Sequence, residues 1–486
     1  MNPTSNHTHP RIAAALRGAT DTRELLLGDG VIDETADVFR LLFGNRPATI
    51  VADANTFEAA GRRVCDLFAR AGLDTCAPFV FEDPNLHACY EHVEKLREAL
   101  TGNQAIPVAV GSGTVNDITK LAAHESGRWY MVVATAASMD GYTAYGASIN
   151  REGSKQTFFC PAPLAVVADM EIIARAPAEL NAAGYGDLVA KAPAGADWML
   201  ADALGVEPII PEVWSLVQDP LRELAACPEG IRKGDRAAIR NLTEGLMMTG
   251  FAMQQAKSSR PASGAEHQFS HLWDMQDHHH HGRIPLHGHK VAIGALASTR
   301  LYEELLRRVG DELDIDAVCG NWPGLSEIED RVDRTHPNGQ LRRVAREEMR
   351  AKYVTPEALR VRLTRLKQIW PTLQERLRRQ LFPADQLRQM LVAAGAPCEP
   401  TEIGIDLERL RRSHIEAQQI RRRYTVLDLA TETGLLSVCL ERLFATDGPW
   451  CKPAAPSASS RPTAADTRNT QAGNGKASQQ QEHLGC

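Results

Sequence analysis

Histidines gather in one short stretch of this sequence: eight of the 16 fall between positions 267 and 289. In SGAEHQFSHLWDM, His267 and His271 are four residues apart, which puts both on one face of a helix. His287 follows in PLHGHKVAIGAL, just before Gly288 at the expected start of another helix. Neutral imidazoles together with a carboxylate form an open site for Zn²⁺ or a similar ion, with positions left for a substrate oxygen. The spacing indicates either one ion held by both helical histidines, or one ligand histidine beside another that faces a substrate.

The carboxylate that would complete this site is Asp187 in NAAGYGDLVAK, just after two glycines at an expected helix start. An alternative interpretation makes Asp187 a helix N-cap with an ion pair to Lys191. His289 is a weaker rival of His287 as a ligand. The four-histidine run 278–281 is expected to be a solvated loop, because consecutive side chains project in different directions.

A glycine-rich turn in IPVAVGSGTVNDITK suggests a second kind of chemistry. We expect a strand over 106–110, a turn over 111–114 and a helix from about Val115. Glycines let the backbone approach a ligand closely, and the free N–H groups at a helix start attract a pyrophosphate. Asp53, at the end of the strand ATIVAD, could accept hydrogen bonds from an adenosine ribose. The alternatives are a tight turn without a ligand and an Asp53 that only caps the next helix.

Two kinds of element must position these residues. From about residue 47 to 173, short apolar runs alternate with amphipathic helical patterns, which is typical of a parallel sheet buried on both faces. After residue 178 strand-like runs nearly vanish and helical signals dominate, such as the Thr355-Pro356-Glu357 start. We therefore expect an α/β dinucleotide-binding domain over 10–177, an all-helical metal and substrate domain over 178–450, and a disordered tail over 451–486.

Composition limits the class of protein further. The 486 residues exceed what one core usually serves, and the net charge of −7 argues against a nucleic-acid partner. The N-terminus lacks the apolar stretch of a signal peptide, and no apolar run is long enough to span a membrane. The ten cysteines form no CxxC pair. These features predict a cytoplasmic protein with ordinary thiols.

Seven blocks of the sequence, in order from about residue 20 to 445, resemble the sn-glycerol-1-phosphate dehydrogenases. They are VADANT, GSGTVNDITK, TAASMDGYTAYGASI, GYGDLVAKAPAGADW, SGAEHQFSH, LHGHKVAIG and IRRRYTVLDL. The similarity is to the bacterial branch of this family, within the superfamily of iron-containing alcohol dehydrogenases and dehydroquinate synthase-like enzymes. It implies a nucleotide-binding α/β domain, a helical domain, an active site in the cleft between them, and a homodimer. It also implies reversible NAD(P)H-dependent reduction of dihydroxyacetone phosphate to sn-glycerol 1-phosphate with bound Zn²⁺ or Ni²⁺.

The resemblance also implies roles for residues at matching positions. Asp187, His267 and His287 match the metal ligands, while Asp140, Asp187 and His271 match the residues that contact the substrate. The implied NAD(H) or NADP(H) contacts are Gly111, Ser112, Gly113, Thr114, Val115, Thr135, Ala136, Ala137 and Ser138. Two positions depart from the family: Ala144 stands where a serine often contacts the cofactor, and His289 stands where a glutamate is usual.

The implied mechanism uses the cation as a Lewis acid on the C2 carbonyl while the nicotinamide delivers hydride. A proton then arrives from water or through His271, and Asp140 orients the free hydroxyl of the substrate. Arg421 and Arg423 are candidates for the substrate phosphate, although a surface helix explains both equally well. The alternatives are a polyol dehydrogenase acting on an unphosphorylated substrate, a dehydroquinate synthase-like sugar-phosphate cyclase, and a non-enzymatic metal-binding role.

Overall fold

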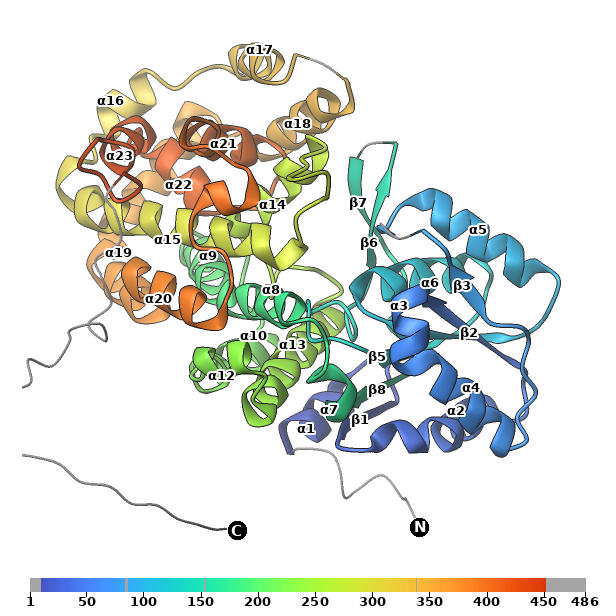
Figure 1. Ribbon diagram of the computed structural model, residues 1–486. Helices are drawn as coiled ribbons and strands as arrows, with labels where there is room; N and C mark the ends of the chain where they lie inside the picture. Colours follow the sequence, from blue (N-terminus) through green and yellow to red (C-terminus); the bar gives the residue numbers. More distant parts are fainter. Residues whose placement is uncertain (1–9, 84–85, 153, 338, 452–486) are drawn as a thin grey trace, which may run out of the picture.

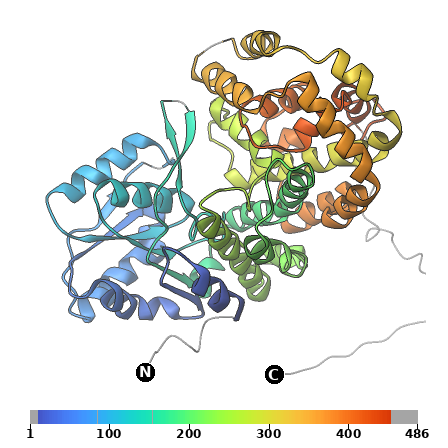
Figure 2. The same cartoon turned by 180° about the vertical axis from the view of Figure 1, so that it is seen from behind.

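The computed structural model describes residues 10–83, 86–152, 154–337 and 339–451. Almost all of the tail expected over 451–486 therefore lies outside the described residues. Figure 1 shows a sheet-containing region built from the first part of the chain beside a larger region built from helices. The same division is seen from behind in Figure 2. Among the described helices, none is long and apolar enough to cross a membrane.

The first region is organised around a sheet of six parallel strands in the order β1-β8-β5-β4-β2-β3. The strands are β1 (Glu24–Gly28), β2 (Ala48–Asp53), β3 (Phe79–Phe81), β4 (Ile106–Gly111), β5 (Met131–Ala134) and β8 (Ala165–Asp169). All five strands expected from the apolar runs are present. The edge strand β1 was not anticipated.

Successive side chains of these strands enter different cores, as the two-residue period of a strand requires. On β1, Leu25 and Leu27 join the core on the face covered by α5 and α6, whereas Leu26 joins the core under α2 and α4. Both faces are therefore apolar, which explains why the strands read as continuous hydrophobic runs. The helices of this region are α1 (Pro10–Gly18), α2 (Thr35–Phe43), α3 (Ala54–Thr56), α4 (Arg62–Arg70), α5 (Tyr90–Thr101), α6 (Gly113–Glu125) and α7 (Met170–Ile173), with turns at Val31–Glu34 and Phe57–Gly61.

The connections of the sheet reverse direction between β2 and β4. From β2 the chain moves outward to β3, whereas from β4 it moves the opposite way to β5. Ligands of open parallel sheets bind outside the carboxyl ends of the strands at such a reversal. Asp53 ends β2 and Gly111 ends β4, so the fold brings both predicted nucleotide-binding positions to this edge.

A small antiparallel hairpin extends from the first region toward the helices. It consists of β6 (Ala147–Arg151) and β7 (Ser154–Phe158), and it was not anticipated from the sequence. Its strand β6 lies against α5 and α6, while β7 contacts α14 of the second region. Figure 1 shows this hairpin standing between the two regions.

From Ala178 to Cys451 the described residues form helices and loops without a named strand. Thr355 caps its helix through a hydrogen bond from the N–H of Ala358, as expected. The helices are α8 (Ala178–Val189), α9 (Lys191–Ala203), α10 (Pro211–Gln218), α11 (Leu221–Leu224), α12 (Pro228–Lys233), α13 (Arg236–Ala256), α14 (Ala265–Met275), α15 (His287–Glu312), α16 (Ile315–Gly320), α17 (Leu325–Thr335), α18 (Gly339–Lys352), α19 (Pro356–Gln380), α20 (Ala384–Ala394), α21 (Leu407–Gln419), α22 (Val426–Glu432) and α23 (Leu436–Leu443), with a 3₁₀ turn at Pro400–Ile403.

Candidate active site

Three helices bring together the three residues expected to bind a metal. Asp187 on α8, His267 on α14 and His287 on α15 each offer one ligand atom, and these atoms all lie within 4.8 Å of one another. The His267 Nε2 atom is 3.6 Å from Asp187 Oδ1, and the rings of His267 and His287 are 5.3 Å apart. Two imidazoles and a carboxylate at such spacing fit a divalent first-row cation.

Glycines at the helix crossings allow this close approach. A Cβ atom on Gly288 would lie 1.9 Å from the carbonyl oxygen of Ala183 on α8. A Cβ atom on Gly294 would lie 2.3 Å from the carbonyl oxygen of Glu266 on α14. Both distances are far inside van der Waals contact, so larger residues would force α15 away from the other two helices. The cluster therefore depends on backbone-to-backbone packing as well as on its ligands.

The structure corrects the position of Asp187 within its helix. Asp187 is not at a helix start, because α8 begins at Ala178 and Asp187 lies in its last turn. The proposed N-cap role is therefore wrong, but the ion pair is present. Lys191 Nζ lies 2.6 Å from Asp187 Oδ1 and 2.7 Å from Asp140 Oδ2. One buried ammonium thus joins the ligand carboxylate to the predicted substrate-contacting carboxylate.

Burial and charge set the protonation of these groups. Burial by itself would raise the pKa of Asp187, but the positive surroundings, the charge of Lys191 first among them, outweigh it and lower that pKa. Burial would lower the pKa of Lys191, but its two carboxylate partners raise it above the usual value. Burial lowers the pKa of His287 to about 3. Near neutral pH, Asp187 is therefore ionised and His287 is a neutral imidazole, which are the forms that bind a cation.

A buried carboxylate orients His267. Glu266 Oε1 accepts a hydrogen bond from Nδ1 of His267 at 2.9 Å and another from the backbone N–H of Gly264 at 2.6 Å. This contact leaves Nε2 as the atom directed toward Asp187. Such a carboxylate–histidine pair fixes the tautomer and increases the basicity of a ligand. Nearby Asp197 has its pKa raised to about 7 by burial and by the charge of Glu266.

His271 lies one helical turn beyond His267, as the four-residue spacing predicted. Its ring is 6.2 Å from that of His267 and 6.3 Å from that of His287. Burial is the main cause that lowers its pKa well below the usual value, with a further contribution from the charge of Arg421. Its Nδ1 atom has no hydrogen-bond partner among the residues that the structure describes. His271 is thus a neutral imidazole beside the cluster, not part of the three-residue group.

The remaining histidines of the stretch are separated from the cluster. His289 is half-buried, its Nε2 atom has no hydrogen bond to any described residue, and it is not in the ligand group. The run 278–281 lies in a loop, but the expectation that it is fully solvated is wrong for His278. That side chain is buried against the carbonyl oxygen of Ile403, 2.6 Å from its Nε2 atom, and faces Arg409.

The glycine-rich turn follows the expected order of strand, turn and helix. Strand β4 ends at Gly111 and α6 begins at Gly113, two residues earlier than the sequence suggested. Ser112 is the N-cap residue, but its side chain makes no capping hydrogen bond. A Cβ atom on Gly113 would lie 2.5 Å from the Met139 side chain. The first turn of α6 therefore keeps N–H groups available to an anion.

The predicted cofactor residues fall into two groups. Ser112, Gly113, Thr114 and Ser138 line the cavity described below, whereas Gly111, Val115, Thr135, Ala136 and Ala137 lie behind them. Asp53 does not line this cavity. Its side chain caps α3 by accepting a hydrogen bond from the N–H of Thr56 at 2.8 Å. Asp53 thus caps α3, as the alternative interpretation proposed. Its second carboxylate oxygen takes no part in that hydrogen bond.

A cavity of about 670 Å³ lies between the two regions of the molecule. The first region contributes the turn residues of α6, Asp140 and residues of the β6–β7 hairpin, and the helical region contributes His267, His271 and His287. The glycine-rich turn and the clustered histidines therefore open onto one space. This arrangement is that of an oxidoreductase that uses a nucleotide and a metal ion.

Comparison with known proteins gives the same class. The family profile described as iron-containing alcohol dehydrogenase matches residues 26–177. Solved structures show the fold: a sulfoacetaldehyde reductase from Bifidobacterium kashiwanohense in complex with NAD+ has a TM-score of 0.57 at 14% identity, over 88% of this chain and 99% of that one.

Closer sequence relatives identify the family. A glycerol-1-phosphate dehydrogenase [NAD(P)+] from Geobacillus thermodenitrificans is 32% identical over 80% of this chain and 88% of its own length. The protein of the same name from Halalkalibacterium halodurans is 37% identical over 54% of this chain and 66% of its own length. The chain therefore belongs to the glycerol-1-phosphate dehydrogenase family.

Some important residues had no distinct signal in the sequence. Lys191 was considered only as a partner of Asp187, and its link to Asp140 depends on the crossing of distant segments. Glu266 was not singled out, although its place directly before His267 was visible. Lys155 on β7 also lines the cavity, but the hairpin that carries it was not predicted.

Proposed function

We propose that this protein catalyses the reversible NAD(P)H-dependent reduction of dihydroxyacetone phosphate to sn-glycerol 1-phosphate. One observation carries the proposal. His267 and His287, which cluster with the buried Asp187, line the same cavity as the glycine-rich turn at the carboxyl edge of the parallel sheet. The family membership supplies the substrate, since relatives over most of the chain are named for glycerol 1-phosphate.

Asp187, His267 and His287 are the residues proposed to hold one divalent cation, either Zn²⁺ or Ni²⁺. When bound, the cation supplies Lewis-acid polarisation of the ketone, and the reduced nicotinamide supplies the hydride. The N–H groups of the α6 start would hold the pyrophosphate, in contact with Gly111, Ser112, Gly113, Thr114 and Val115, and the segment Thr135, Ala136, Ala137 and Ser138 would contact the rest of the cofactor. Asp53 is proposed to accept from the adenosine ribose with the oxygen that its cap does not use.

The surrounding residues hold charge and protons in place. Lys191 favours the ionised forms of Asp187 and Asp140, and so acts against burial and the charge of Asp187, which raise the pKa of Asp140. Asp140 is proposed to accept a hydrogen bond from the free hydroxyl of the substrate. His271, neutral and without a described partner at Nδ1, is placed to pass a proton between water and the substrate oxygen.

The family resemblance further suggests a homodimer in the cytoplasm. Sedimentation of the purified protein would measure its oligomeric state, and a monomer at micromolar concentration would contradict the dimer.

An activity assay tests the proposed reaction. The oxidation of NADH and of NADPH is followed with dihydroxyacetone phosphate, with dihydroxyacetone and without a ketone, before and after chelation. We expect oxidation with the phosphorylated ketone, its loss on chelation, and its return with Zn²⁺ or Ni²⁺. Activity on the unphosphorylated ketone alone would show a polyol dehydrogenase and refute the proposal.

A matched pair of variants tests the ligand group. His287→Ala removes a proposed ligand, whereas His289→Ala removes a half-buried histidine two residues away. We expect the bound metal to fall to a small fraction of one per chain in the first variant and to remain in the second. Retention in His287→Ala with loss in His289→Ala would reverse the assignment.

A further inference from the structure

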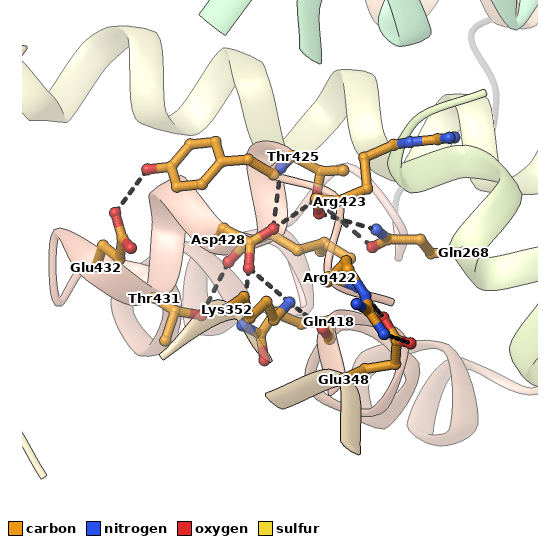
Figure 3. A network of polar contacts seen from close by, with 12 residues as sticks. Gln268, Glu348, Lys352, Gln418, Arg422, Arg423, Thr425, Asp428, Thr431 and Glu432 are labelled. Carbon is orange, nitrogen blue, oxygen red and sulfur yellow. Dashed lines mark hydrogen bonds and ion pairs between the residues drawn. The ribbon is translucent and has the colours of Figure 1, made fainter. Parts of the chain in front are cut away.

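Three consecutive arginines, Arg421, Arg422 and Arg423, follow α21 and line the cavity. The sequence offered no way to choose among them. Their contacts in the structure differ, and the difference bears on how the enzyme would hold an anionic group. Figure 3 shows Arg422 and Arg423 within the polar network around α22.

Arg422 forms an ion pair within the protein, with Glu348. Its guanidinium lies 2.8 Å from Glu348 Oε1 and its Nε atom lies 3.0 Å from Glu348 Oε2. Its backbone N–H also donates to Glu348 Oε2 at 2.6 Å. Both oxygens of Glu348 are thereby occupied, and Figure 3 shows the two side chains pointing toward each other.

Arg423 is also hydrogen-bonded within the protein, to Ser263 and Ser259. Its guanidinium donates to the carbonyl oxygen of Ser263 at 2.9 Å and to the hydroxyl of Ser259 at 3.0 Å. Burial, together with the charge of Arg260, lowers the pKa of Arg423 to about 9. Arg423 thus holds the turn before α14 and has little capacity left for a ligand.

Arg421 differs from both neighbours. No hydrogen bond and no ion pair joins its guanidinium to another residue in the described parts of the chain. Arg421 is half-buried at the cavity, and burial lowers its pKa. The charge of Glu348 acts against this, but both oxygens of Glu348 are bonded to Arg422. A partly buried guanidinium without a hydrogen-bonded anion of its own is costly, and a bound anion would offset that cost.

The loop that carries Arg421 is fixed on its C-terminal side. The backbone N–H of Arg422 is bonded to Glu348, and the carbonyl oxygen of Arg423 accepts from Gln268 at 3.3 Å. Thr425 then donates its N–H to Asp428 at 2.9 Å as α22 begins. Figure 3 shows Arg422, Arg423 and Thr425 within this network, which holds the backbone that follows Arg421.

A second cation faces the cavity from the other region of the molecule. Lys155 on β7 has Asp274 as its carboxylate neighbour at 3.8 Å, and Asp274 is already bonded to Lys290. Lys155 and Arg421 line the same cavity as His271, which lies next to the proposed ligands His267 and His287. The carboxylates Asp140 and Asp187, by contrast, are joined to Lys191.

We propose that Arg421 is the principal binding group for the phosphate monoester of the substrate, with Lys155 as a second cation across the cavity. This inference rests on the proposed function, because it assigns the phosphate of that same substrate. A guanidinium fork matches the geometry of two phosphate oxygens, and a monoester carries close to two negative charges near neutral pH. In the substrate only a methylene and an ester oxygen separate the carbonyl carbon from phosphorus, which suits cations placed beside His271. Arg421 is thereby the residue that distinguishes phosphorylated from unphosphorylated ketones.

Steady-state kinetics with both ketones test this assignment. Arg421→Gln should raise the KM for dihydroxyacetone phosphate about 10- to 100-fold, the usual loss for one charged contact, while any rate with dihydroxyacetone stays unchanged. Arg421→Lys should recover part of the loss, because it restores the charge without the fork. Lys155→Met should raise the same KM by a smaller factor. Arg376→Gln removes one positive charge from the exposed face of α19, away from the cavity, and should leave the KM within about twofold.

Inorganic phosphate provides a probe that does not depend on the natural substrate. We expect it to bind the metal-loaded wild-type protein in calorimetry and to bind Arg421→Gln about tenfold more weakly or worse. Wild-type activity on dihydroxyacetone phosphate with an unchanged KM in Arg421→Gln and Arg421→Lys would overturn the phosphate assignment while leaving the proposed function intact. A wild-type protein that reduces only dihydroxyacetone would refute the proposed function, and phosphate binding that depends on Arg421 would then still support an anion site. Matching thermal unfolding of the variants excludes a folding defect.

Discussion

At the scale of single residues, the site depends on how charge is balanced in a buried place. Asp187 and Asp140 lie close together out of water, and Lys191 contacts both. A cation bound by Asp187, His267 and His287 would add positive charge to the same group. Lys191 therefore stabilises the carboxylates most when no cation is present.

Replacement of Lys191 by Met should reveal this balance. Removal of one member of a buried ion pair leaves an uncompensated charge, which costs about 3 to 5 kcal/mol of unfolding free energy. We expect this loss in the chelated protein and a clearly smaller loss in the metal-loaded protein. Thermal or denaturant unfolding of both forms measures the difference. Lys257→Met, at an exposed ion pair with Asp21, should cost about 1 kcal/mol or less in both forms. Equal losses for Lys191→Met with and without metal would contradict this account.

The sequence predicted the proposed ligand residues better than it predicted the contacts that hold these residues in place. Spacing alone favoured His267 and His271 as partners on one helix, but only the resemblance to the family separated the ligand from the substrate-facing residue. The tie between Lys191 and Asp140 joins α9 to a loop of the first region, and no pattern in the sequence encodes that contact. Arg421 could not be distinguished from Arg423, because their difference lies in the partners that each finds in the folded chain.

At the scale of elements, the site depends on how closely three helices pack. Helix α15 approaches α8 at Gly288 and α14 at Gly294, and these contacts bring His287 to the other ligands. The helical character of this region was visible from the sequence as periodic patterns. The places where the helices cross could not be predicted, because a glycine within a helical pattern does not indicate which other helix packs against it.

A pair of glycine variants on α15 tests this packing. Gly288→Ala places a methyl group against the carbonyl oxygen of Ala183, and the backbone of α8 cannot move aside without a loss of folding free energy. We expect a loss of roughly 2 kcal/mol or more and weaker metal binding, measured by unfolding and by chelator competition. Gly310→Ala lies on the same helix, where the nearest atom outside the helix is 3.5 Å away in Trp370. It should be neutral or stabilising by up to about 1 kcal/mol. A stable, metal-binding Gly288→Ala protein would contradict the role of this crossing.

Helix α21 carries a buried histidine that should make stability depend on pH. Burial lowers the pKa of His414 to about 4, so it is neutral in the folded chain at pH values where it would gain a proton after unfolding. Its contribution is complete above its ordinary value of 6.5 and is lost as pH falls from 6.5 toward 4. Over that interval the loss approaches about 3 kcal/mol.

His414→Phe should remove this contribution, since the site already contacts Phe269 and Phe444. Denaturant unfolding at several pH values measures it. We expect the slope of unfolding free energy against pH to decrease between pH 4 and 6.5 in the variant. An unchanged slope would show that His414 keeps its proton affinity in the folded chain.

At the scale of the whole molecule, the active site lies where the two regions meet. The parallel sheet brings Asp53 and Gly111 to one edge, and the helices present their ligands toward the same cavity. The class of fold and its buried strands could be predicted, because sheets covered on both faces leave continuous apolar runs. The β6–β7 hairpin could not, since Ser154–Phe158 is polar and short. Lys155, the residue that the first region adds to the proposed phosphate site, was missed for the same reason, because it lies on this hairpin.

The configuration of the glycerol phosphate that the enzyme uses tests the central claim most directly. Metal-loaded protein is supplied with NAD+ or NADP+ and with each enantiomer separately, and reduction of the cofactor is followed. Because Asp140, His271 and the two cations are proposed to contact different groups of the substrate, we expect oxidation of sn-glycerol 1-phosphate and no comparable rate with sn-glycerol 3-phosphate. A preference for sn-glycerol 3-phosphate, or activity confined to unphosphorylated glycerol, would contradict the account.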